Sequence, residues 1–197
     1  KGKEQFISYI GTGNFNESTS RIYGDLGLLT SESTISKEIK KVFHLIENHF
    51  ERGLFRQLMV SPFNTRRKIM NLIENEINFT KNKKKAGLIR IKMNNLVDRK
   101  LIEKLYEASN SGVKIELIIR GFCCLVPGVK NQSENIEVIS IVDRYLEHAR
   151  FMIFGNNGKP LYFLTSADWM ERNLDKRIEV GCPVLSINLQ RELDLIF

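Results

Sequence analysis

The sequence is poor in cysteine and has no long apolar run. Its three cysteines, Cys123, Cys124 and Cys182, form no CxxC pair and no Cys/His cluster with the spacing of a zinc site. So few thiols indicate reduced, structural cysteines in a cytoplasmic protein. No apolar stretch approaches the roughly 20 residues of a membrane-spanning helix, and no secretory signal is present. Whether the full-length protein associates with a membrane stays open.

The sequence also lacks an initiator methionine. It opens with KGKEQFISYI, inside a strand-like run, so we expect a fragment of a longer chain. Lys and Arg total 30 against 23 acidic residues, which gives a net charge of +7 and an isoelectric point near 9.3. This basic balance favours an anionic partner such as a nucleotide, polyphosphate, nucleic acid or lipid surface. Hydrophobic residues make up 42% of the chain, which is enough for a packed core.

The apolar pattern predicts an α/β fold. Apolar residues at helical spacing predict helices over residues 34–50, 64–82, 97–112 and 187–197. Alternating or continuous apolar runs predict strands within residues 7–16, 54–62, 87–94, 113–121, 135–142, 148–155, 160–167 and 177–184. The strand–helix–strand order over residues 87–121 is typical of a parallel sheet covered by helices. Because a new βα series begins near residues 51–54, we expect a domain boundary after residue 53.

Two short segments repeat one another. GTGN at residues 11–14 and TSAD at residues 165–168 each follow a strand, and each is followed eleven residues later by a carboxylate. Both copies therefore run from a strand into a small polar turn and then to an acid. The comparison pairs Thr12 with Ser166, Asn14 with Asp168, and Asp25 with Glu179.

His148 precedes the second copy. The order resembles the phospholipase D pattern, in which a His-x-Lys strand comes before a Gly-Ser-x-Asn turn and a carboxylate. In such a site the turn binds phosphoryl oxygens, and the carboxylate holds the imidazole in the correct tautomer. Arg150 stands in place of the Lys and Gly155 in place of an Asp, which argues against an ordinary phosphodiesterase. Since these sites use two such halves, the His of the first half is expected upstream of Lys1.

Longer strings of the chain resemble a known family. The strings are IGTGNFNESTSRIYGDLGLLTS, KMNNLVDRKLIEKLYEASNSGVKIELIIRGFCCLVPG, SENIEVISIVDRYLEHARFMIFGN and LTSADWMERNLDKRIEVGCPV. In order and spacing they are similar to the C-terminal half of bacterial polyphosphate kinases. The resemblance implies a phospholipase D-like α/β fold with a mixed or parallel sheet flanked by helices. It also implies that residues 1–53 end a first domain of this kind and that residues 54–197 form the second.

The resemblance also implies an activity. That family reversibly transfers the terminal phosphate of ATP to inorganic polyphosphate with Mg²⁺, through a phosphohistidine on the first half's His. Both that His and the magnesium ligands are expected upstream of Lys1, so no metal ligand is assigned within this chain and the chain alone is expected to be inactive. The implied partners are ATP, ADP and polyphosphate, and the full-length protein is expected to be a homo-oligomer.

Three positions match nucleotide contacts of the family: Tyr23 in STSRIYGDLGLLT, Arg120 in LIIRGFCCL and His148 in RYLEHAR. His148 is the expected catalytic residue, as an acid/base or as electrostatic help during phosphoryl transfer. Arg120 ends a buried strand, where it is either a snorkelling surface Arg or a ligand of the γ-phosphate. Tyr23 is either a core aromatic or a nucleotide contact. Further candidates share a polar side chain near the presumed site: Arg150, Ser166, Asp168, Asn14, Asp25, Glu179, Lys92 and Asn94.

Two other functions compete with phosphotransfer. One is a phospholipase D-like phosphodiesterase or nuclease, which hydrolysis of a bis-ester substrate would identify. The other is a basic module that binds a polyanion without catalysis. Nucleic acid is not the expected partner, because the chain lacks aromatic side chains interleaved with basic ones and any recognition-helix signature.

Overall fold

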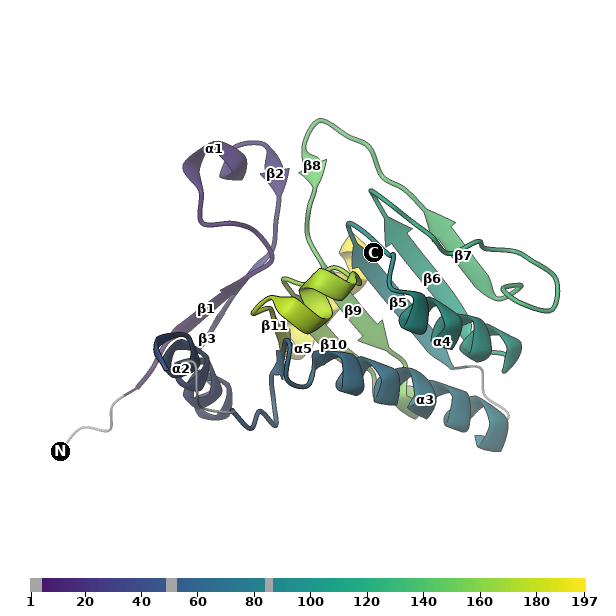
Figure 1. Ribbon diagram of the computed structural model, residues 1–197, viewed down its shortest axis with the longest axis horizontal. Coiled ribbons are helices and arrows are strands. Elements are labelled where there is room, and N and C mark those ends of the chain that lie inside the picture. The colour runs from purple at the N-terminus through teal and green to yellow at the C-terminus, as the bar shows by residue number, and fades with distance from the viewer. Residues whose placement is uncertain (1–4, 49–52, 84–86) are drawn as a thin grey trace.

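A seven-stranded mixed sheet forms the main body of the protein (Figure 1). The computed structural model describes residues 5–48, 53–83 and 87–197. The sheet has the strand order β4-β11-β10-β9-β5-β6-β7. The bounds of its strands, in chain order, are Met59–Val60 for β4, Leu88–Met93 for β5, Lys114–Ile119 for β6, Ile136–Ile139 for β7, Phe151–Phe154 for β9, Leu161–Thr165 for β10 and Val180–Pro183 for β11. This mixed α/β architecture confirms the fold class expected from the sequence.

The parallel part of the sheet is a βαβ unit. Strands β5, β6 and β7 pair in parallel, and helix α4 (Arg99–Asn110) connects β5 to β6. The helix begins where the Asp98 side chain accepts the N–H of Leu101 at 3.0 Å. It ends before Gly112, whose φ of 87° suits a glycine that follows a helix. The predicted order over residues 87–121 is confirmed, whereas β4, β9, β10 and β11 join the sheet in antiparallel pairs.

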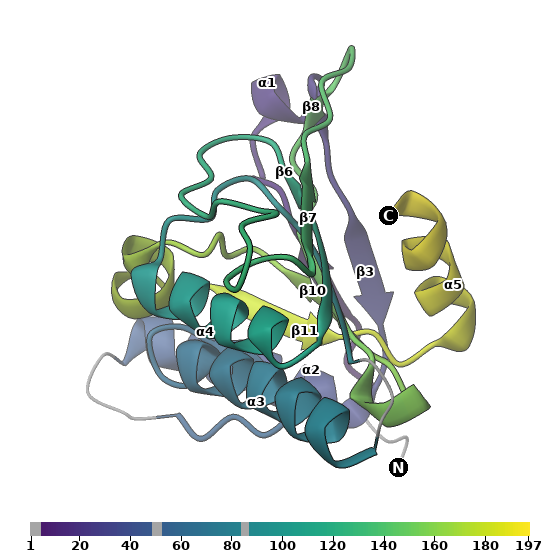
Figure 2. The same ribbon diagram turned by 90° about the vertical axis from the view of Figure 1, so that its right-hand side faces the viewer.

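Helices cover both faces of the sheet (Figure 2). Helices α3 (Thr65–Lys83) and α4 lie on one face, and α5 (Ile187–Ile196) lies on the other. Alternate residues of β9 divide between the two layers, as the pleat requires. Met152 and Phe154 pack with α3 and α4, whereas Phe151 and Ile153 pack in the α5 layer.

The N-terminal part of the chain is a smaller, attached unit. Strands β1 (Ser8–Gly11) and β3 (Gly27–Thr30) form an antiparallel ribbon, followed by α2 (Ser33–Glu47). Between the ribbon strands lie the short helix α1 (Glu17–Ser20) and strand β2 (Tyr23–Gly24). Strand β2 pairs in parallel with β8 (Leu146–Glu147), so segments more than 120 residues apart lie side by side (Figure 1). Two short helical turns complete the chain, η1 (Asn156–Gly158) and the π-type turn η2 (Arg172–Lys176).

The strand predicted over residues 54–62 is wrong for most of its length. Only Met59–Val60 is a strand, because the carboxylate of Glu38 on α2 accepts the backbone N–H groups of Arg56, Gln57 and Leu58 at 2.7–3.2 Å. Those groups are then not free for a β ladder. The strand expected over residues 135–142 also ends early, at Ile139. The domain boundary after residue 53 stays a prediction, since residues 49–52 lie outside the described part of the chain.

No helix in the described part of the chain is both long enough and apolar enough to cross a membrane. The described surface nevertheless carries many exposed apolar side chains in the N-terminal unit, including Ile7, Tyr9, Phe15 and Leu29. The two strands of the β1–β3 ribbon pair only with each other among the described residues. This unit is therefore much less covered than the main sheet.

Candidate active site

His148 lies where the two units of the chain meet. Its backbone N–H and that of Ala149 both donate to the carbonyl oxygen of Gly24, at 3.1 and 2.9 Å. The chain thus leaves the β2–β8 pair at His148 and enters the main sheet at Phe151. The prediction that His148 itself belongs to a strand over residues 148–155 is wrong, because its N–H is used for this junction. The side chain of His148 is only 10% exposed.

Three side chains hold the imidazole of His148. Its Nδ1 lies 2.9 Å from Asp25 Oδ1, and since an ionised carboxylate only accepts, Nδ1 carries the proton. Its Nε2 lies 3.2 Å from Nη2 of Arg150, which can only donate, so Nε2 is the acceptor. The ring of Tyr23 packs at 4.7 Å between centroids and 47° between planes. Arg150 and His148 thus contact each other directly.

The imidazole of His148 favours its neutral form. Burial and the positive charge of Arg150 lower the pKa of His148 below its usual 6.5, with a further lowering from Arg120. The hydrogen bond to Asp25 opposes this shift but does not overcome it. The contact with Asp25 is therefore a hydrogen bond from a neutral ring, and Nε2 keeps a lone pair that can take a proton.

This lowered pKa predicts a stability difference with pH. Above pH 6.5 His148 is neutral in both the folded and unfolded chains. As the pH falls below 6.5 the unfolded chain takes up the proton first, so the wild type loses folding free energy until the pH passes the lower folded pKa. Denaturant unfolding between pH 7.5 and 5.5 should therefore show a larger loss for wild type than for His148→Gln. A larger loss in the variant would contradict the lowered pKa.

Arg150 and Asp168 form a buried ion pair beneath the imidazole. Arg150 Nε donates to Asp168 Oδ1 at 2.9 Å, and Nη1 donates to the carbonyl oxygen of Thr12 at 2.9 Å. Burial alone would raise the pKa of Asp168, but the guanidinium, the Asn95 side chain and the N–H of Asn94 outweigh it and lower that pKa. The pair therefore stays charged and fixes the guanidinium beside His148.

The ends of two parallel strands supply the other cations. Arg120 follows β6, and its Nε donates to Asn94 Oδ1 at 2.9 Å and to the carbonyl oxygen of Glu147 at 3.1 Å. Lys92 is buried near the end of β5, where its Nζ contacts the Glu147 carboxylate at 2.9 Å. The Asn94 side chain also donates to the carbonyl oxygen of His148 at 3.3 Å. Ligands of parallel α/β sheets bind at such carboxyl ends of strands.

The internal repeat is a structural repeat. The Thr12 hydroxyl donates to Asp25 at 2.7 Å, and the Ser166 hydroxyl makes the same bond to Glu179. Each hydroxyl also accepts the N–H of the residue after its carboxylate, at 3.0 Å from Leu26 and 3.2 Å from Val180. Equivalent turns thus hold equivalent carboxylates in the two units.

The sequence candidates fall into two groups in space. Contacts join one group around the imidazole: Tyr23, Asp25, Lys92, Asn94, Arg120, His148, Arg150 and Asp168. Ser166 and Glu179 form a second group, in which Asn173 Nδ2 also donates to Glu179 at 2.6 Å. Asn14 belongs to neither group and is exposed.

Three residues that bind side chains of these two groups were not predicted from the sequence. Glu147 receives Lys92 and Arg120, Asn95 holds Asp168, and Asn173 holds Glu179. Glu147 is the direct neighbour of His148 in sequence, and Asn95 follows Asn94, so proximity to a predicted residue was the available signal. Asn173 had no such signal, because its role depends on how η2 folds back onto β11.

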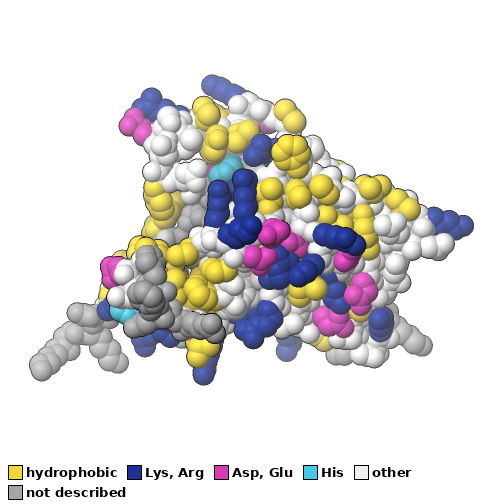
Figure 3. Space-filling model, in the orientation of Figure 1, with side chains coloured by type: hydrophobic (Ala, Val, Ile, Leu, Met, Phe, Trp, Pro, Cys, Tyr) yellow, Lys and Arg dark blue, Asp and Glu magenta, His cyan; other side chains and the backbone are white. Residues whose placement is uncertain are grey.

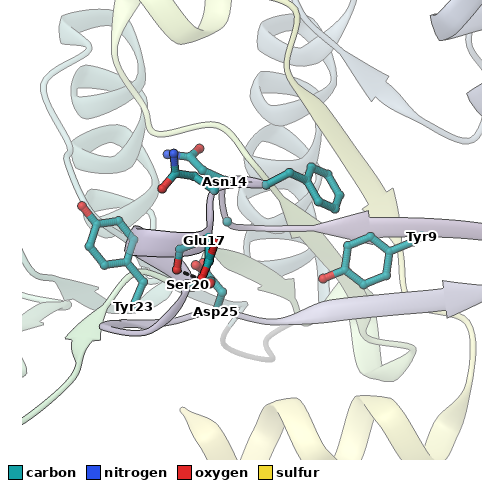
Figure 4. Close-up of a pocket in the computed structure, with 9 residues that line it drawn as sticks. Tyr9, Asn14, Glu17, Ser20, Tyr23 and Asp25 are labelled. Atoms are coloured by element: carbon teal, nitrogen blue, oxygen red, sulfur yellow. Dashed lines mark hydrogen bonds between the residues drawn. The ribbon is translucent and has the colours of Figure 1, made fainter.

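A pocket of about 490 Å³ adjoins Tyr23 and Asp25 in the N-terminal unit (Figure 4). Tyr9 and Tyr23 lie on opposite sides of it, and Asn14 also lines it. Its volume falls in the range of small-ligand sites. On the face shown in Figure 3, a group of Lys and Arg side chains gathers at the surface. The two charged residues that line the pocket, Glu17 and Asp25, are both acidic, so the Lys and Arg side chains in Figure 3 lie outside its lining.

The carboxylates near His148 do not fit a magnesium site of their own. Asp25 is engaged by Thr12 and His148, Asp168 by three donors, and Glu147 by Lys92. Within residues 5–48, 53–83 and 87–197, no group of three or more His, Cys, Asp or Glu side chains could hold a metal ion. The magnesium ligands expected upstream of Lys1 stay a prediction.

Gly155, where the phospholipase D pattern has an Asp, lies beside another carboxylate. Glu76 on α3 accepts the N–H groups of Leu88 and Asn156, at 3.1 and 2.6 Å. A Cβ on Gly155 would approach the Glu76 carboxylate to 3.4 Å. An Asp at this position would therefore lie close to a second carboxylate.

Comparison with known proteins identifies the family of the chain. The family model described as polyphosphate kinase C-terminal domain 2 matches residues 58–197, and the model of C-terminal domain 1 matches residues 1–52. The polyphosphate kinase of Vibrio parahaemolyticus is 54% identical over 189 residues, which are 95% of this chain and 27% of that protein. The polyphosphate kinase of Escherichia coli K12 is 50% identical over 190 residues, or 96% of this chain and 28% of that protein.

Solved structures agree with this result. The crystal structure of polyphosphate kinase from Porphyromonas gingivalis matches with a TM-score of 0.92 and 46% identity, over 98% of this chain and 29% of that one. NucT from Helicobacter pylori shares the fold alone, with a TM-score of 0.51 and 16% identity over 71% of this chain and 90% of that one. The chain therefore belongs to the polyphosphate kinase family and corresponds to its C-terminal domains, somewhat more than a quarter of the length of its relatives.

Proposed function

We propose that the full-length protein reversibly transfers the terminal phosphate of ATP to inorganic polyphosphate, and that this chain supplies one half of the site. The observation that carries the proposal is the neutral imidazole of His148, held by Asp25 and Arg150 with Tyr23 and Arg120 beside it. A buried imidazole among fixed cations suits a transferring phosphoryl group, whose negative charge such cations stabilise.

Each nearby side chain has a proposed role. Tyr23 contacts the nucleotide, and Arg120 binds a phosphate of it through the N–H groups that Asn94 and Glu147 do not use. An incoming phosphate oxygen competes for the Nη2–H of Arg150 and so releases Nε2 of His148. His148 then takes up or returns a proton, or offers a hydrogen bond, while the phosphoryl group passes to the upstream His.

The contact between Asp25 and His148 joins the two units of the chain. In the repeat, Glu179 is held by Ser166 as Asp25 is held by Thr12. Glu179 is therefore the proposed partner for the upstream His, which would complete a second, equivalent half-site. Mg²⁺ held by upstream residues, a homo-oligomeric assembly and a cytoplasmic location belong to the same proposal for the whole protein.

Arg120→Ala should weaken transition-state stabilisation in the full-length protein. Removing one preorganised donor costs about 3–4 kcal/mol, so kcat should fall about 10²–10³-fold. Steady-state kinetics of polyphosphate synthesis would measure this, with Arg99→Ala as the control, because Arg99 is exposed on α4 and pairs only with Glu103 among the described residues. Equal rates for the two variants would remove Arg120 from the site.

The main alternative is a phosphodiesterase, which the phospholipase D-like order of His148, the Ser166 turn and Glu179 in the sequence allows. The test gives the full-length protein ATP with a polyphosphate primer in one assay, and bis(p-nitrophenyl) phosphate in another. We expect chain growth in the first and no hydrolysis in the second. Hydrolysis of the diester without chain growth would support the alternative.

A further inference from the structure

Asn94 lies at the end of β5, directly beside the end of β6. The two strands pair in parallel up to Met93 and Ile119. Beyond that pair, the N–H of Gly121 donates to the carbonyl oxygen of Asn94 at 2.7 Å. The register of the sheet therefore places Asn94 next to Arg120, at the edge where ligands of parallel α/β sheets bind.

Both ends of the Asn94 amide are already bound. Its Oδ1 accepts the Nε–H of Arg120 at 2.9 Å, and its Nδ2 donates to the carbonyl oxygen of His148 at 3.3 Å. A guanidinium can only donate and a carbonyl oxygen can only accept, so the two partners fix the orientation of the amide. Asn94 is also only 1% exposed. Its side chain is therefore not placed to contact a substrate, although the sequence singled it out as a candidate site residue.

The backbone of Asn94 reaches a third group of the site. Its N–H donates to Asp168 Oδ1 at 2.9 Å, and the same oxygen accepts the Nε–H of Arg150. Arg150 in turn contacts Nε2 of His148. One buried residue is thus hydrogen-bonded to Arg120, to the His148 backbone and to the carboxylate that holds Arg150.

The orientation of the Arg120 guanidinium depends on its Nε–H. Asn94 and the carbonyl oxygen of Glu147 share this donor, at 2.9 and 3.1 Å. Because the guanidinium is a rigid planar fork, holding Nε also sets the directions of its other N–H groups. Loss of the Asn94 side chain would leave the longer of the two bonds and let the fork turn. A displacement of about 1 Å in such a site can lower the rate about 10²-fold.

We propose that Asn94 is a positioning residue that sets the placement of Arg120 relative to His148, a role that rests on the proposed function. Asn94 itself touches neither the nucleotide nor the phosphoryl group. It acts through the guanidinium that binds a phosphate and through the imidazole that exchanges a proton. A carboxylate in its place could not donate to the His148 carbonyl oxygen, and an aliphatic side chain of similar shape could neither donate nor accept.

The test is a double-mutant cycle in the full-length protein, with Asn94→Leu, Arg120→Ala and the two together. Asn94→Leu keeps the shape of the side chain but removes both hydrogen bonds. It should lower kcat for polyphosphate synthesis about 10²-fold, with the KM for ATP within about threefold of wild type, because no direct contact with the nucleotide is lost. The double variant should lose at least about tenfold less than the product of the two single losses, since residues that act as a unit are not additive.

Asn135→Leu is the matched control. Asn135 directly precedes β7, at the opposite edge of the parallel strands, and its Nδ2 donates to the carbonyl oxygen of Ser109 at 2.9 Å. The control therefore also loses an amide–carbonyl hydrogen bond, but away from the site, and its kcat should stay within about twofold of wild type. Thermal unfolding midpoints are measured for each variant, and Asn94→Ala repeats the cycle if Asn94→Leu does not fold.

The outcomes separate this role from the proposed function. Single losses that multiply in the double variant would overturn the role, because Asn94 would then act independently of Arg120. An unchanged kcat in Asn94→Leu would also overturn it, and a raised KM for ATP beside that kcat would indicate a direct contact with the nucleotide. Both results leave the proposed function standing. A wild type that forms no polyphosphate would overturn the proposed function and the role of Asn94 with it.

Discussion

His148→Ala should reduce polyphosphate synthesis by the full-length protein at least about 10²-fold, without unfolding it. The substitution removes the imidazole that Asp25, Arg150 and Tyr23 hold, and general acid–base groups of this kind contribute about 10²–10⁴-fold. It leaves the Arg150–Asp168 pair intact, so the fold should survive. Initial rates of chain elongation and the thermal unfolding midpoint would measure the two effects.

His44→Ala is a suitable control for that experiment. His44 lies on α2 with its side chain exposed, and it belongs to neither group of candidate residues. Its replacement should leave the elongation rate within about twofold of wild type, as expected of a surface position. Near-normal elongation in His148→Ala would remove His148 from the site, whatever His44 shows.

Asp168→Ala should destabilise the 197-residue chain by about 3–5 kcal/mol, the usual result of leaving a buried charge without its partner. Asp168 and Arg150 are 4% and 8% exposed, so solvent cannot replace the lost carboxylate. The variant also leaves the N–H of Asn94 and the amide of Asn95 without their acceptor. Denaturant unfolding at neutral pH would measure the change.

Two further variants show whether the buried charge is the cause. Among the described residues, Glu171 makes one ion pair, the exposed contact with Lys176, so Glu171→Ala should change the free energy of unfolding little. Adding Arg150→Met to Asp168→Ala removes the unpaired charge and should recover part of the loss. A loss below about 1 kcal/mol in Asp168→Ala would contradict a tightly held ion pair.

Periodicity in the sequence predicted the central elements of the fold well. The βαβ unit from β5 to β6, helices α3 and α5, and strands β9 and β10 lie within or close to their expected ranges. These elements bury one clear apolar face or stripe, so the pattern of their residues decides their structure. The strand prediction failed over residues 54–58 because a carboxylate distant in sequence, that of Glu38, accepts their backbone N–H groups. The local apolar pattern does not decide the structure there.

The sequence singled out several of the side chains that the structure brings together around His148, but not how they pair. The spacing of the repeat singled out Asp25 and Glu179, the phospholipase D-like pattern singled out His148, and the family resemblance added Arg120. That Asp25 of one unit would hold His148 of the other depends on β2 pairing with β8. A two-residue strand of this kind has no periodicity to read, and its register is set by tertiary contacts.

The proposed phosphoryl transfer runs through an upstream histidine, at a site that this chain completes. Its most direct test incubates the full-length protein with ATP labelled in its terminal phosphate, Mg²⁺ and a polyphosphate primer, and follows acid-labile phosphohistidine together with chain length. We expect label on histidine that then moves into lengthened polyphosphate. Cleavage of a phosphodiester, with neither phosphohistidine nor elongation, would contradict it.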